Sequence, residues 1–483
     1  MDRKWAALII VCVGTFMLLL DITVVNVALP DIQKELHASF TDLQWVVDAY
    51  ALTLATAVLI AGTLGDLLGR KRVFLFGVGL FTAASAACGA APNPLVLNLS
   101  RGVQGVGGAI VIAVALAIIS QEFQGKERGT AFGAWGATIG AAVAIGPLVG
   151  GVLTTWLGWR AIFYVNLPIG IICIVVGMRV LHESRNEQHG SFDIGGFITL
   201  TGGLFSLVLA LLRGNDWGWG SGREIALYIV AGVLLSAFVL IELRVEDPML
   251  DLSLFRIPTF TGAQIVAFAI SASIFSQFLY LTLYLQNVLG YSPIQAGLRF
   301  LPLSLISFVV APIAGRLSTR IPVRILLGLG MALVGIALLL MHGVTVSSGW
   351  TALLPGFLLA GIGVGMVNAP LASTAVSVVE PQRAGMASGT NNTFRQVGIA
   401  TGIAGLGAIF QDRIASELHG VGSAASVASG AVQGSEIAHA AFISGLNEIL
   451  LVGAIVAFAG GLLGFLLVRG RDFVASGPSP AGS

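Results

Sequence analysis

Charged residues are scarce in this sequence. Only 10% of its 483 residues are Asp, Glu, Lys or Arg, whereas 56% are hydrophobic, and the formal net charge is +1. A soluble domain typically carries about 25% charged residues, so this chain could not cover a water-facing surface, and an ordinary soluble enzyme is excluded. The high hydrophobicity also excludes a disordered chain. The remaining class is a polytopic membrane protein whose apolar surface faces lipid.

Other missing features narrow the function further. The longest basic run has three residues and starts at Arg70, so we expect no nucleic-acid binding. The three cysteines, Cys12, Cys88 and Cys173, lie in apolar runs without metal-ligand spacing. The six histidines are scattered, and no Gly-x-x-x-x-Gly-Lys-Ser/Thr loop is present. We therefore expect no metal, no cofactor, no nucleotide and no enzymatic activity.

Long apolar runs are what the chain has instead. We count fourteen runs that are long enough, at about 20 residues each, to cross a hydrocarbon core as α-helices. They lie near residues 5–29, 44–64, 73–92, 95–120, 130–155, 161–180, 194–212, 224–243, 259–285, 294–315, 323–342, 350–374, 385–410 and 440–468. Because the runs are continuous rather than alternating, membrane β-strands are excluded. The predicted fold class is an all-α polytopic membrane protein.

The basic residues are unevenly distributed between the predicted loops. If the N-terminus lies in the cytoplasm, most of the 25 Lys and Arg residues fall in inside segments. The outside segments then hold only Lys34, Arg160, Arg213, Arg223 and Arg413. Cytoplasmic loops of membrane proteins are enriched in Lys and Arg, so this bias supports the count of fourteen. We predict a protein of the cell (plasma) membrane with both termini in the cytoplasm.

Two segments in the two parts of the chain resemble each other. Residues 61–70 (AGTLGDLLGR) and residues 311–320 (APIAGRLSTR) are identical at four positions, among them Gly65 with Gly315, Leu67 with Leu317 and Arg70 with Arg320. Two parallel halves about an axis along the membrane normal form a transporter architecture, although Gly-rich loops can also match by chance. The predicted units are an N-terminal six-helix half (1–182), a linker with two inserted helices (183–250), a C-terminal six-helix half (251–470) and a disordered cytoplasmic tail (471–483).

Five motifs occur in a fixed order in the first half. They are LDITVVNVALP at 20–30, QWVVDAY at 44–50, Gly62-xxx-Asp66-xx-Gly69-Arg70-Lys71-Arg72, Arg101-xx-Gln104-Gly105-x-Gly107 and Gly146-Pro147-xx-Gly150-Gly151. With the helix count, they resemble the major facilitator superfamily, and more narrowly its fourteen-helix drug/proton antiporter branch of the EmrB/QacA type. The resemblance implies two six-helix halves plus two inserted helices. It also implies export of hydrophobic small molecules, such as drugs and antibiotics, in exchange for protons by alternating access. We expect the chain to work as a monomer in the lipid bilayer.

Three charged residues are predicted within the outer half of the first six-helix unit. Counted at about 1.5 Å per residue from the predicted outer helix ends, Asp21 lies roughly 13 Å deep, Arg101 roughly 10 Å and Asp48 roughly 6 Å. A charge at membrane depth costs about 2.5–3.5 kcal/mol or more unless it is paired or hydrated, so Asp21 is expected to pair with Arg101. For Asp48, an interfacial position near Trp45 fits as well as a role in proton coupling.

A buried carboxylate beside an arginine can gain and lose a proton when the arginine or the access of water changes. The resemblance implies this proton-coupling role for Asp21 and Arg101. A static structural ion pair between the two side chains is the alternative.

The loop after the second predicted span is short and basic. Its glycines permit close approach of helices, and the resemblance implies a cytoplasmic gate whose charge contacts hold the outward-facing state. The implied gate residues are Gly62, Asp66, Gly69, Arg70 and Arg72. Simple anchoring of a basic loop on the inside is the alternative, and the two roles are compatible. In the second half Arg316 stands in the place of Asp66, so any gate there must be weaker or different.

The fifth predicted span carries the motif Gly146, Pro147, Gly150 and Gly151. Pro147 removes a backbone hydrogen bond and should kink the helix, while the glycines leave a smooth face for a neighbouring helix. In the resembled family this motif marks exporters, although Ala142 replaces one expected small residue, and generic helix packing is the alternative. The alternative function is proton-coupled uptake of a small metabolite by symport, and this span argues against it.

Polar residues of the second half are candidates for a substrate cavity. Arg395 lies about 15 Å from the cytoplasmic end of its predicted span. Buried arginines face the bundle interior by default, so Arg395 can orient substrate or stabilise closure, and bonding to backbone carbonyls is an equal alternative. The predicted cavity residues are Asn26, Gln277, Tyr284, Asn391 and Arg395.

Overall fold

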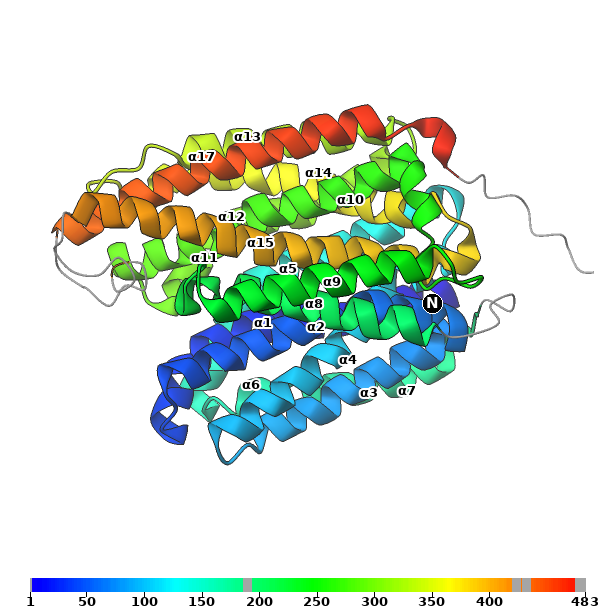
Figure 1. Ribbon diagram of the computed structural model, residues 1–483, viewed down its shortest axis with the longest axis horizontal. Helices are drawn as coiled ribbons and strands as arrows, with labels where there is room; N and C mark the ends of the chain where they lie inside the picture. Colours follow the sequence, from blue (N-terminus) through cyan, green and yellow to red (C-terminus); the bar gives the residue numbers. More distant parts are fainter. Residues whose placement is uncertain (1, 186–192, 419–426, 428–435, 474–483) are drawn as a thin grey trace, which may run out of the picture.

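The computed structural model describes residues 2–185, 193–418, 427 and 436–473. Over these residues the chain is a bundle of long α-helices without a β-strand, and the helices lie roughly side by side (Figure 1). The expected all-α fold is therefore confirmed for the described part of the chain.

The helices follow the predicted spans in order. The N-terminal part consists of α1 (Arg3–Leu36), α2 (Phe40–Leu68), α3 (Arg70–Gly89), α4 (Pro94–Glu122), α5 (Gly125–Leu157), α6 (Ala161–Tyr164) and α7 (Asn166–Val180). The next helices are α8 (Ile194–Trp217), α9 (Gly222–Glu242) and the 3-10 turn η1 (Leu252–Arg256). The C-terminal part consists of α10 (Pro258–Ile270), η2 (Ser271–Phe275), α11 (Ser276–Leu283), η3 (Tyr284–Val288), α12 (Pro293–Leu317), α13 (Val323–Met341), η4 (Trp350–Leu353), α14 (Leu354–Ser377), η5 (Pro381–Arg383), α15 (Ala384–Leu418), α17 (Glu436–Leu467) and η6 (Gly470–Asp472).

Twelve helical segments among the described residues are long and apolar enough to cross a membrane. They correspond to twelve of the fourteen predicted spans. The helices at the two other predicted spans, α5 and α15, are not among them, although they have 33 and 35 residues. The chain is thus a multi-pass membrane protein, and the count of fourteen stays a prediction.

Several helices differ from their predicted spans. The first helix continues through Pro30 and ends at Leu36, before His37 adopts a left-handed backbone conformation with φ of 50°. The ninth predicted span is not one regular helix, because the π-helical turns η2 and η3 interrupt it. Such turns widen the helix locally and are frequent at functional sites.

The predicted external loop and C-terminal tail are only partly described. Helix α15 continues to Leu418, into the segment that was predicted as a loop, and residues 419–426 and 428–435 lie outside the described residues. The tail predicted from 471 begins with an ordered turn, since Asp472 Oδ2 accepts a hydrogen bond of 2.7 Å from the Thr259 hydroxyl. Residues 474–483 lie outside the described residues.

Two helix pairs join the two halves. Helix α2 packs against α15, and α5 packs against α12. In each pair two glycines face each other, Gly62 with Gly385 and Gly129 with Gly315, and a Cβ on either partner would collide with the opposite carbonyl oxygen. Helices α2 and α12, which carry the two similar sequence segments, thus each pack against a helix from the other part of the chain.

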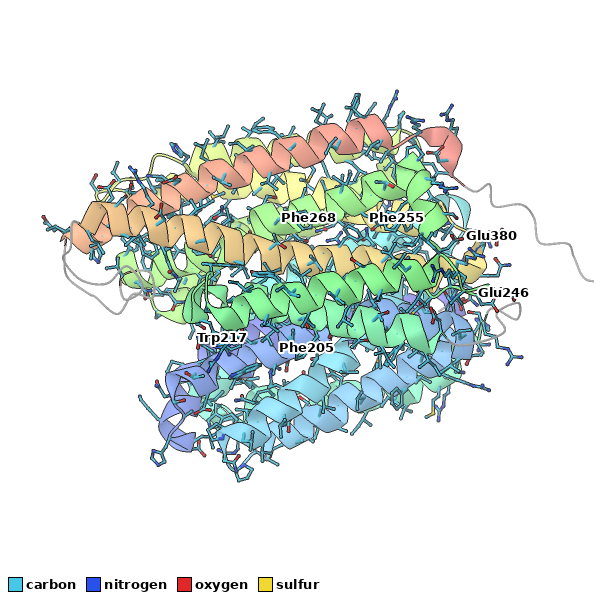
Figure 2. The ribbon with its side chains drawn as sticks, in the orientation of Figure 1. Phe205, Trp217, Glu246, Phe255, Phe268 and Glu380 are labelled. Atoms are coloured by element: carbon cyan, nitrogen blue, oxygen red, sulfur yellow. The ribbon has the colours of Figure 1, made fainter. Side chains whose placement is uncertain are left out.

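The two ends of the described chain lie at the same end of the bundle (Figure 1). Glu246 and Glu380 lie at this end as well, whereas Trp217 lies toward the other end (Figure 2). Arg70, directly after α2, donates a hydrogen bond to the carbonyl of Pro381, which follows Glu380, so the loop after α2 and the loop before α15 meet at this end (Figure 2).

Candidate functional site

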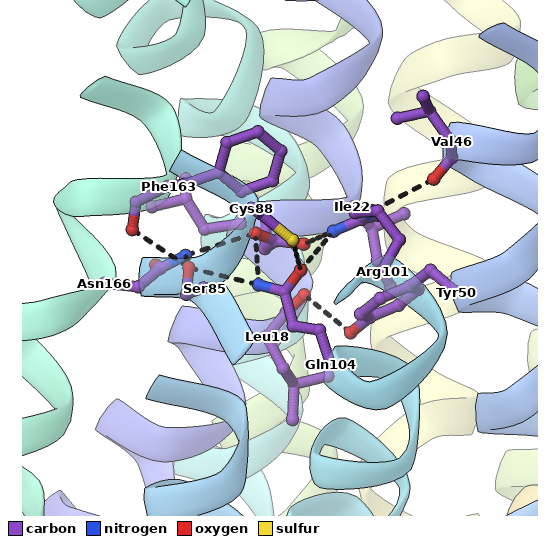
Figure 3. Close-up of polar contacts among 12 residues, drawn as sticks. Leu18, Ile22, Val46, Tyr50, Ser85, Cys88, Arg101, Gln104, Phe163 and Asn166 are labelled. Atoms are coloured by element: carbon purple, nitrogen blue, oxygen red, sulfur yellow. Dashed lines mark hydrogen bonds and ion pairs between the residues drawn. The ribbon is translucent and has the colours of Figure 1, made fainter. Parts of the chain in front are cut away.

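A buried polar network joins α1, α2, α3, α4 and α7 (Figure 3). Arg101 of α4 forms an ion pair with Asp21 of α1, and each residue is only 2% exposed. Arg101 Nε also donates a hydrogen bond of 3.0 Å to the Val46 carbonyl, and its guanidinium carbon lies 4.3 Å from the centre of the Tyr50 ring. The structure thus brings together the two residues whose depths suggested pairing, and both contacts to α2 hold the guanidinium in place.

The Asp21 carboxylate accepts further hydrogen bonds from two buried amides. Gln104 Nε2 donates to Oδ1 at 2.9 Å, and Asn166 Nδ2 donates to the same oxygen at 3.1 Å. The Ser85 hydroxyl oxygen accepts from both amides, at 3.2 and 3.0 Å, and donates to the Phe163 carbonyl at 2.9 Å. All these neighbours of the carboxylate are donors, so the site matches its ionised form. A proton on Asp21 would leave the guanidinium without its counter-charge.

Some residues of this network can be predicted from the sequence, and others cannot. Gln104 follows Arg101 by three residues on α4, so both side chains lie on one helix face toward α1. Asn166 and Ser85 belong to no motif. The only available signal for Asn166 is an amide in an otherwise apolar segment, and serine is common in membrane helices.

Asp48 does not belong to this network. Its Oδ2 lies 3.1 Å from Nη2 of Arg213 in the inserted helix α8. Arg213 Nη1 also donates to Gln44 Oε1 at 3.0 Å and to Asp216 Oδ2 at 3.2 Å, and the guanidinium lies 4.5 Å from the centre of the Trp45 ring. The prediction that Arg213 lies in an outside loop is wrong, because α8 continues past it and buries it against α2.

At the other end of α2, Asp66 and Arg70 connect the two halves. Arg70 Nε and Nη2 donate to Asp66 Oδ1 at 3.0 and 2.8 Å. The same carboxylate accepts from the backbone N–H groups of Gly385 at 3.0 Å and Met386 at 2.8 Å, in the first turn of α15. Arg70 Nη2 also donates to the Pro381 carbonyl at 2.5 Å. Free amides and the helix dipole stabilise a carboxylate at a helix N-terminus, so this contact closes the two halves against each other.

The remaining predicted gate residues have identifiable contacts. A side chain at Gly62 would collide with a backbone carbonyl of α15, and Gly69 has a φ of 106° that other residues rarely adopt. The Glu183 carboxylate accepts from the backbone N–H groups of Lys71 at 3.1 Å and Arg72 at 3.3 Å, and also lies 3.6 Å from Arg72 Nε. Arg72 therefore contacts the linker rather than α15, and no motif pointed to Glu183.

The corresponding segment of the second half makes a different contact. Arg316 Nε donates to the Thr130 hydroxyl oxygen at 3.4 Å, which is a long hydrogen bond. The Thr319 hydroxyl donates to a carbonyl of its own segment at 2.8 Å. The contact between α5 and α12 thus consists of glycine packing and one weak polar contact, whereas the contact between α2 and α15 includes a buried carboxylate.

The glycines of the α5 motif face two neighbouring helices. A Cβ at Gly146 would collide with the Thr23 side chain of α1, and Gly150 also lies against α1. Gly151 lies against Ile294 of α12. Pro147, and with it the predicted kink, lies outside the part of α5 whose side chains the structure describes. This helix therefore packs closely on both halves.

A second buried polar cluster lies between α10, α14 and α15. Arg395 Nη1 donates to Asn368 Oδ1 at 3.0 Å, and Arg395 Nε donates to Asn391 Oδ1 at 3.5 Å. Asn391 Nδ2 donates to Gln264 Oε1 at 3.1 Å. Two of the five predicted cavity residues, Asn391 and Arg395, are thus brought together.

The other three predicted cavity residues lie elsewhere. Asn26 is exposed and donates to a carbonyl of its own helix at 3.4 Å. Gln277 Nε2 donates to the Ile449 carbonyl of α17 at 2.5 Å, and the Tyr284 hydroxyl donates to the Ser348 carbonyl at 3.2 Å. These two side chains bind neighbouring backbone within the C-terminal half and do not join Arg395.

We compared the sequence of this chain with known protein families. Residues 11–403 match the family described as Major Facilitator Superfamily. The chain belongs to the Major Facilitator Superfamily. Members of this superfamily are transporters, and the match covers most of both halves of the bundle.

Individual relatives agree with this assignment. The multidrug resistance protein Stp of Mycobacterium tuberculosis is 39% identical over 399 residues, which are 82% of this chain and 74% of that protein. The tetracenomycin C resistance and export protein of Streptomyces glaucescens is 33% identical over 483 residues, covering 94% of this chain and 90% of that protein. The superfamily and these relatives identify the chain as a transporter rather than an enzyme.

A solved structure shares the fold. The crystal structure of the human organic anion transporter MFSD10 (TETRAN) matches with a TM-score of 0.66 and covers 97% of this chain and 100% of that chain. The sequence identity is 15%, so the match concerns the fold alone.

Proposed function

We propose that this transporter exports hydrophobic small molecules, drugs and antibiotics among them, across the plasma membrane in exchange for protons. The carrying observation is the buried Asp21 carboxylate, paired with Arg101 and surrounded by donors. An ionisable group at membrane depth is expensive, and such groups mark proton and ion pathways. The names of the relatives, which refer to multidrug resistance and to export of tetracenomycin C, support export over uptake.

Helix α2 can carry the effect of protonation from one end of the bundle to the other. A proton arriving from outside neutralises Asp21 and weakens its hold on Arg101. Arg101 is bound to α2 through the Val46 carbonyl and the Tyr50 ring, and Asp66 lies near the other end of the same helix. A shift of α2 then withdraws Asp66 from the amides of α15 and opens the cytoplasmic side.

We also propose that α5 and α15 cross the membrane, which gives the fourteen spans of the EmrB/QacA branch with both termini in the cytoplasm. Each helix is longer than the about 20 residues that a span needs. The polar residues that lower the hydropathy of α15, such as Asn391 and Arg395, are buried in the bundle rather than exposed to lipid. The halves are then residues 1–182 and 251–470, with the inserted pair within 183–250, and one chain forms the whole transport path.

Chemical labelling of introduced cysteines tests this topology. Cysteines at Gln124 and Gln382 should react only from the cytoplasmic side, and cysteines at Gly158 and Asp412 only from outside, because α5 and α15 separate them. Labelling of both members of either pair from one side would exclude a crossing by that helix.

The substitution Asp21→Asn tests proton exchange. In inside-out vesicles whose lumen is acidified by respiration, tetracenomycin C should enter as protons leave, and a dye that reports the pH gradient should show its collapse. Asp21→Asn keeps the size of the side chain but cannot ionise, so the collapse should be lost while the protein still inserts in the membrane. The matched control is Asp31→Asn, an exposed carboxylate on the same helix, which should behave like the wild type.

A gradient collapse of normal size in Asp21→Asn would exclude the proposal. A symporter would also be recognised in this assay, because it moves substrate and proton in the same direction. Substrate added outside such vesicles would then leave the acidic lumen unchanged.

A further inference from the structure

Arg395 differs from the other buried arginines of the bundle. Arg70, Arg101 and Arg213 are each 5% exposed or less, and each faces a carboxylate within ion-pair distance. Arg395 is 9% exposed and forms no ion pair with any residue that the structure describes. A buried charge without a partner is unfavourable, so this guanidinium requires an explanation.

Acidic residues are nearly absent from the helices around Arg395. Between residues 252 and 411, Glu380 is the only Asp or Glu in the sequence. Glu380 is exposed and lies in the loop before α15, at the end of the bundle (Figure 2). Asp21, Asp48 and Asp66 of the other half already have arginine partners. The buried Glu224 and Glu242 lie on α9, which packs mainly against α8. No residue that the structure describes supplies a counter-charge to Arg395, so a bound molecule can supply it.

The atoms left unpaired around Arg395 are donors. Arg395 Nη2 and Gln264 Nε2 are buried and have no hydrogen-bond partner. The amide oxygens of Asn368, Asn391 and Gln264 already accept hydrogen bonds. Because buried polar groups are nearly always paired, the cluster lacks an acceptor as well as a negative charge.

The cluster lies where the two halves meet. Its residues come from α10, α14 and α15, and both α14 and α15 contact α4 of the N-terminal half. Separation of the halves during transport would expose this face of the C-terminal half. A molecule bound between the halves can therefore reach Arg395.

We infer that Arg395, with Gln264, Asn368 and Asn391, binds an anionic oxygen of the transported molecule, such as a carboxylate or phenolate on a hydrophobic ring system. The inference rests on the proposed transport function and adds the chemical class of the substrate. A guanidinium can hold a carboxylate through two parallel hydrogen bonds, and the free Nη2 supplies donors for them. The N-terminal half then handles the proton at Asp21, and the C-terminal half handles the negative group of the substrate.

Equilibrium binding of two matched probes tests the inference. The full-length transporter in detergent is titrated by calorimetry with 2-naphthoate and with 2-naphthamide, which have the same ring and differ in charge. The wild type should bind the acid about tenfold more tightly or better, because a hydrogen bond to a charged group is stronger than one to a neutral group. Arg395→Gln should abolish this preference.

Two further variants make the result specific. Arg395→Lys retains the charge but not the paired hydrogen bonds, so the preference for the acid should be reduced and still measurable. Arg299→Gln removes an arginine of the same half that stacks on Tyr291, at 3.4 Å from the ring centre, and should bind like the wild type. If Arg395→Gln does not fold, the reduced preference of Arg395→Lys decides the matter.

Equal affinity of the wild type for the two probes, no binding of 2-naphthoate, or a preference that survives Arg395→Gln would overturn the inference. Binding at equilibrium needs no pH gradient, so Asp21→Asn should keep the preference for the acid. If proton exchange is absent from the wild type but the preference for 2-naphthoate is present, only the proposed proton coupling is excluded. If the wild type exchanges protons but shows no preference for 2-naphthoate, only the proposed anion site at Arg395 is excluded.

Discussion

At the residue scale, the two buried carboxylates of the first half differ in what holds them. All partners of Asp21 come from its own half, since Arg101, Gln104 and Asn166 lie on α4 and α7. Asp66 instead accepts from backbone amides of the opposite half. The contacts of Asp21 therefore do not depend on the opposite half, whereas the contacts of Asp66 with α15 break only when the halves separate. This difference suits a proton site and a gate, respectively.

A third carboxylate, that of Asp251, lies near Asp66 but outside the membrane-spanning helices. Asp251 Oδ2 lies 2.5 Å from Arg383 Nη1, which ties the loop after α9 to the turn before α15. Burial raises the pKa of Asp251, but hydrogen bonds from Ser253 and the Arg383 guanidinium outweigh it, so the pKa lies below its usual range. Such a group contributes stability above its ordinary pKa of about 3.9, and the contribution is lost only as the pH falls through the lower folded value.

Asp251→Asn should therefore lower the thermal stability by the same amount at pH 6 and pH 8. A partly exposed pair of this kind is worth about 0.2–1 kcal/mol, which a melting curve of the purified protein can resolve. Glu246→Gln, an exposed residue of the same loop, is the control and should change nothing. A destabilisation by Asp251→Asn that disappears at pH 6 would contradict this reading.

The sequence allowed some of these residue roles to be predicted. Asp21 and Arg101 could be paired because both stand alone in apolar runs at similar depth, where an unpaired charge is costly. Asn166 and Glu183 could not be found, because an amide in a membrane helix and an acid in a polar linker have many ordinary roles. The contact of Asp66 with the backbone amides of α15 could not be predicted either, because every residue type except proline has a backbone N–H group.

At the scale of helices, α8, which we predicted as one of two inserted helices, packs against both α2 and α15. Its Arg213 pairs with Asp48 of α2. Its Val208 joins an apolar cluster with Leu52 of α2 and Ala400 of α15. The inserted helix thus contacts both halves, so its packing must change when they move relative to each other.

Arg213→Gln should destabilise the protein by about 1–3 kcal/mol, because it leaves the partly buried Asp48 charge without its partner. The double variant Asp48→Asn, Arg213→Gln should recover much of this loss, since neither charge then remains. Melting curves of the two single variants and the double variant form a double-mutant cycle. Strictly additive losses would show that the two side chains do not interact.

The sequence predicted where helices lie better than where they end. Pro30 suggested the end of the first span, yet α1 continues to Leu36 because a proline near an exposed helix end removes only one hydrogen bond. Arg213 was placed outside because the apolar run ends before it, and only the packing of α8 on α2 keeps it buried. The π-helical turns of the ninth span depend on packing that no local pattern reports.

At the scale of the whole molecule, two similar halves carry different chemistry. The pairs α2 with α15 and α5 with α12 repeat the same glycine contact, and α2 and α12 carry the two similar sequence segments. The first half holds the buried carboxylates Asp21 and Asp66, each paired with an arginine, whereas the second half holds Arg395, which forms no ion pair with a described residue. In our account this asymmetry separates the proton from the substrate, so that binding of one can favour release of the other through movement of the halves.

The central claim is that Asp21 carries the exchanged proton. It is tested most directly by the pH change that follows addition of tetracenomycin C to the detergent-solubilised transporter in weakly buffered solution. The account predicts that the wild type releases protons on binding and that Asp21→Asn binds the compound without releasing them. Proton release of equal size from Asp21→Asn would contradict the account, as would binding to the wild type without any release.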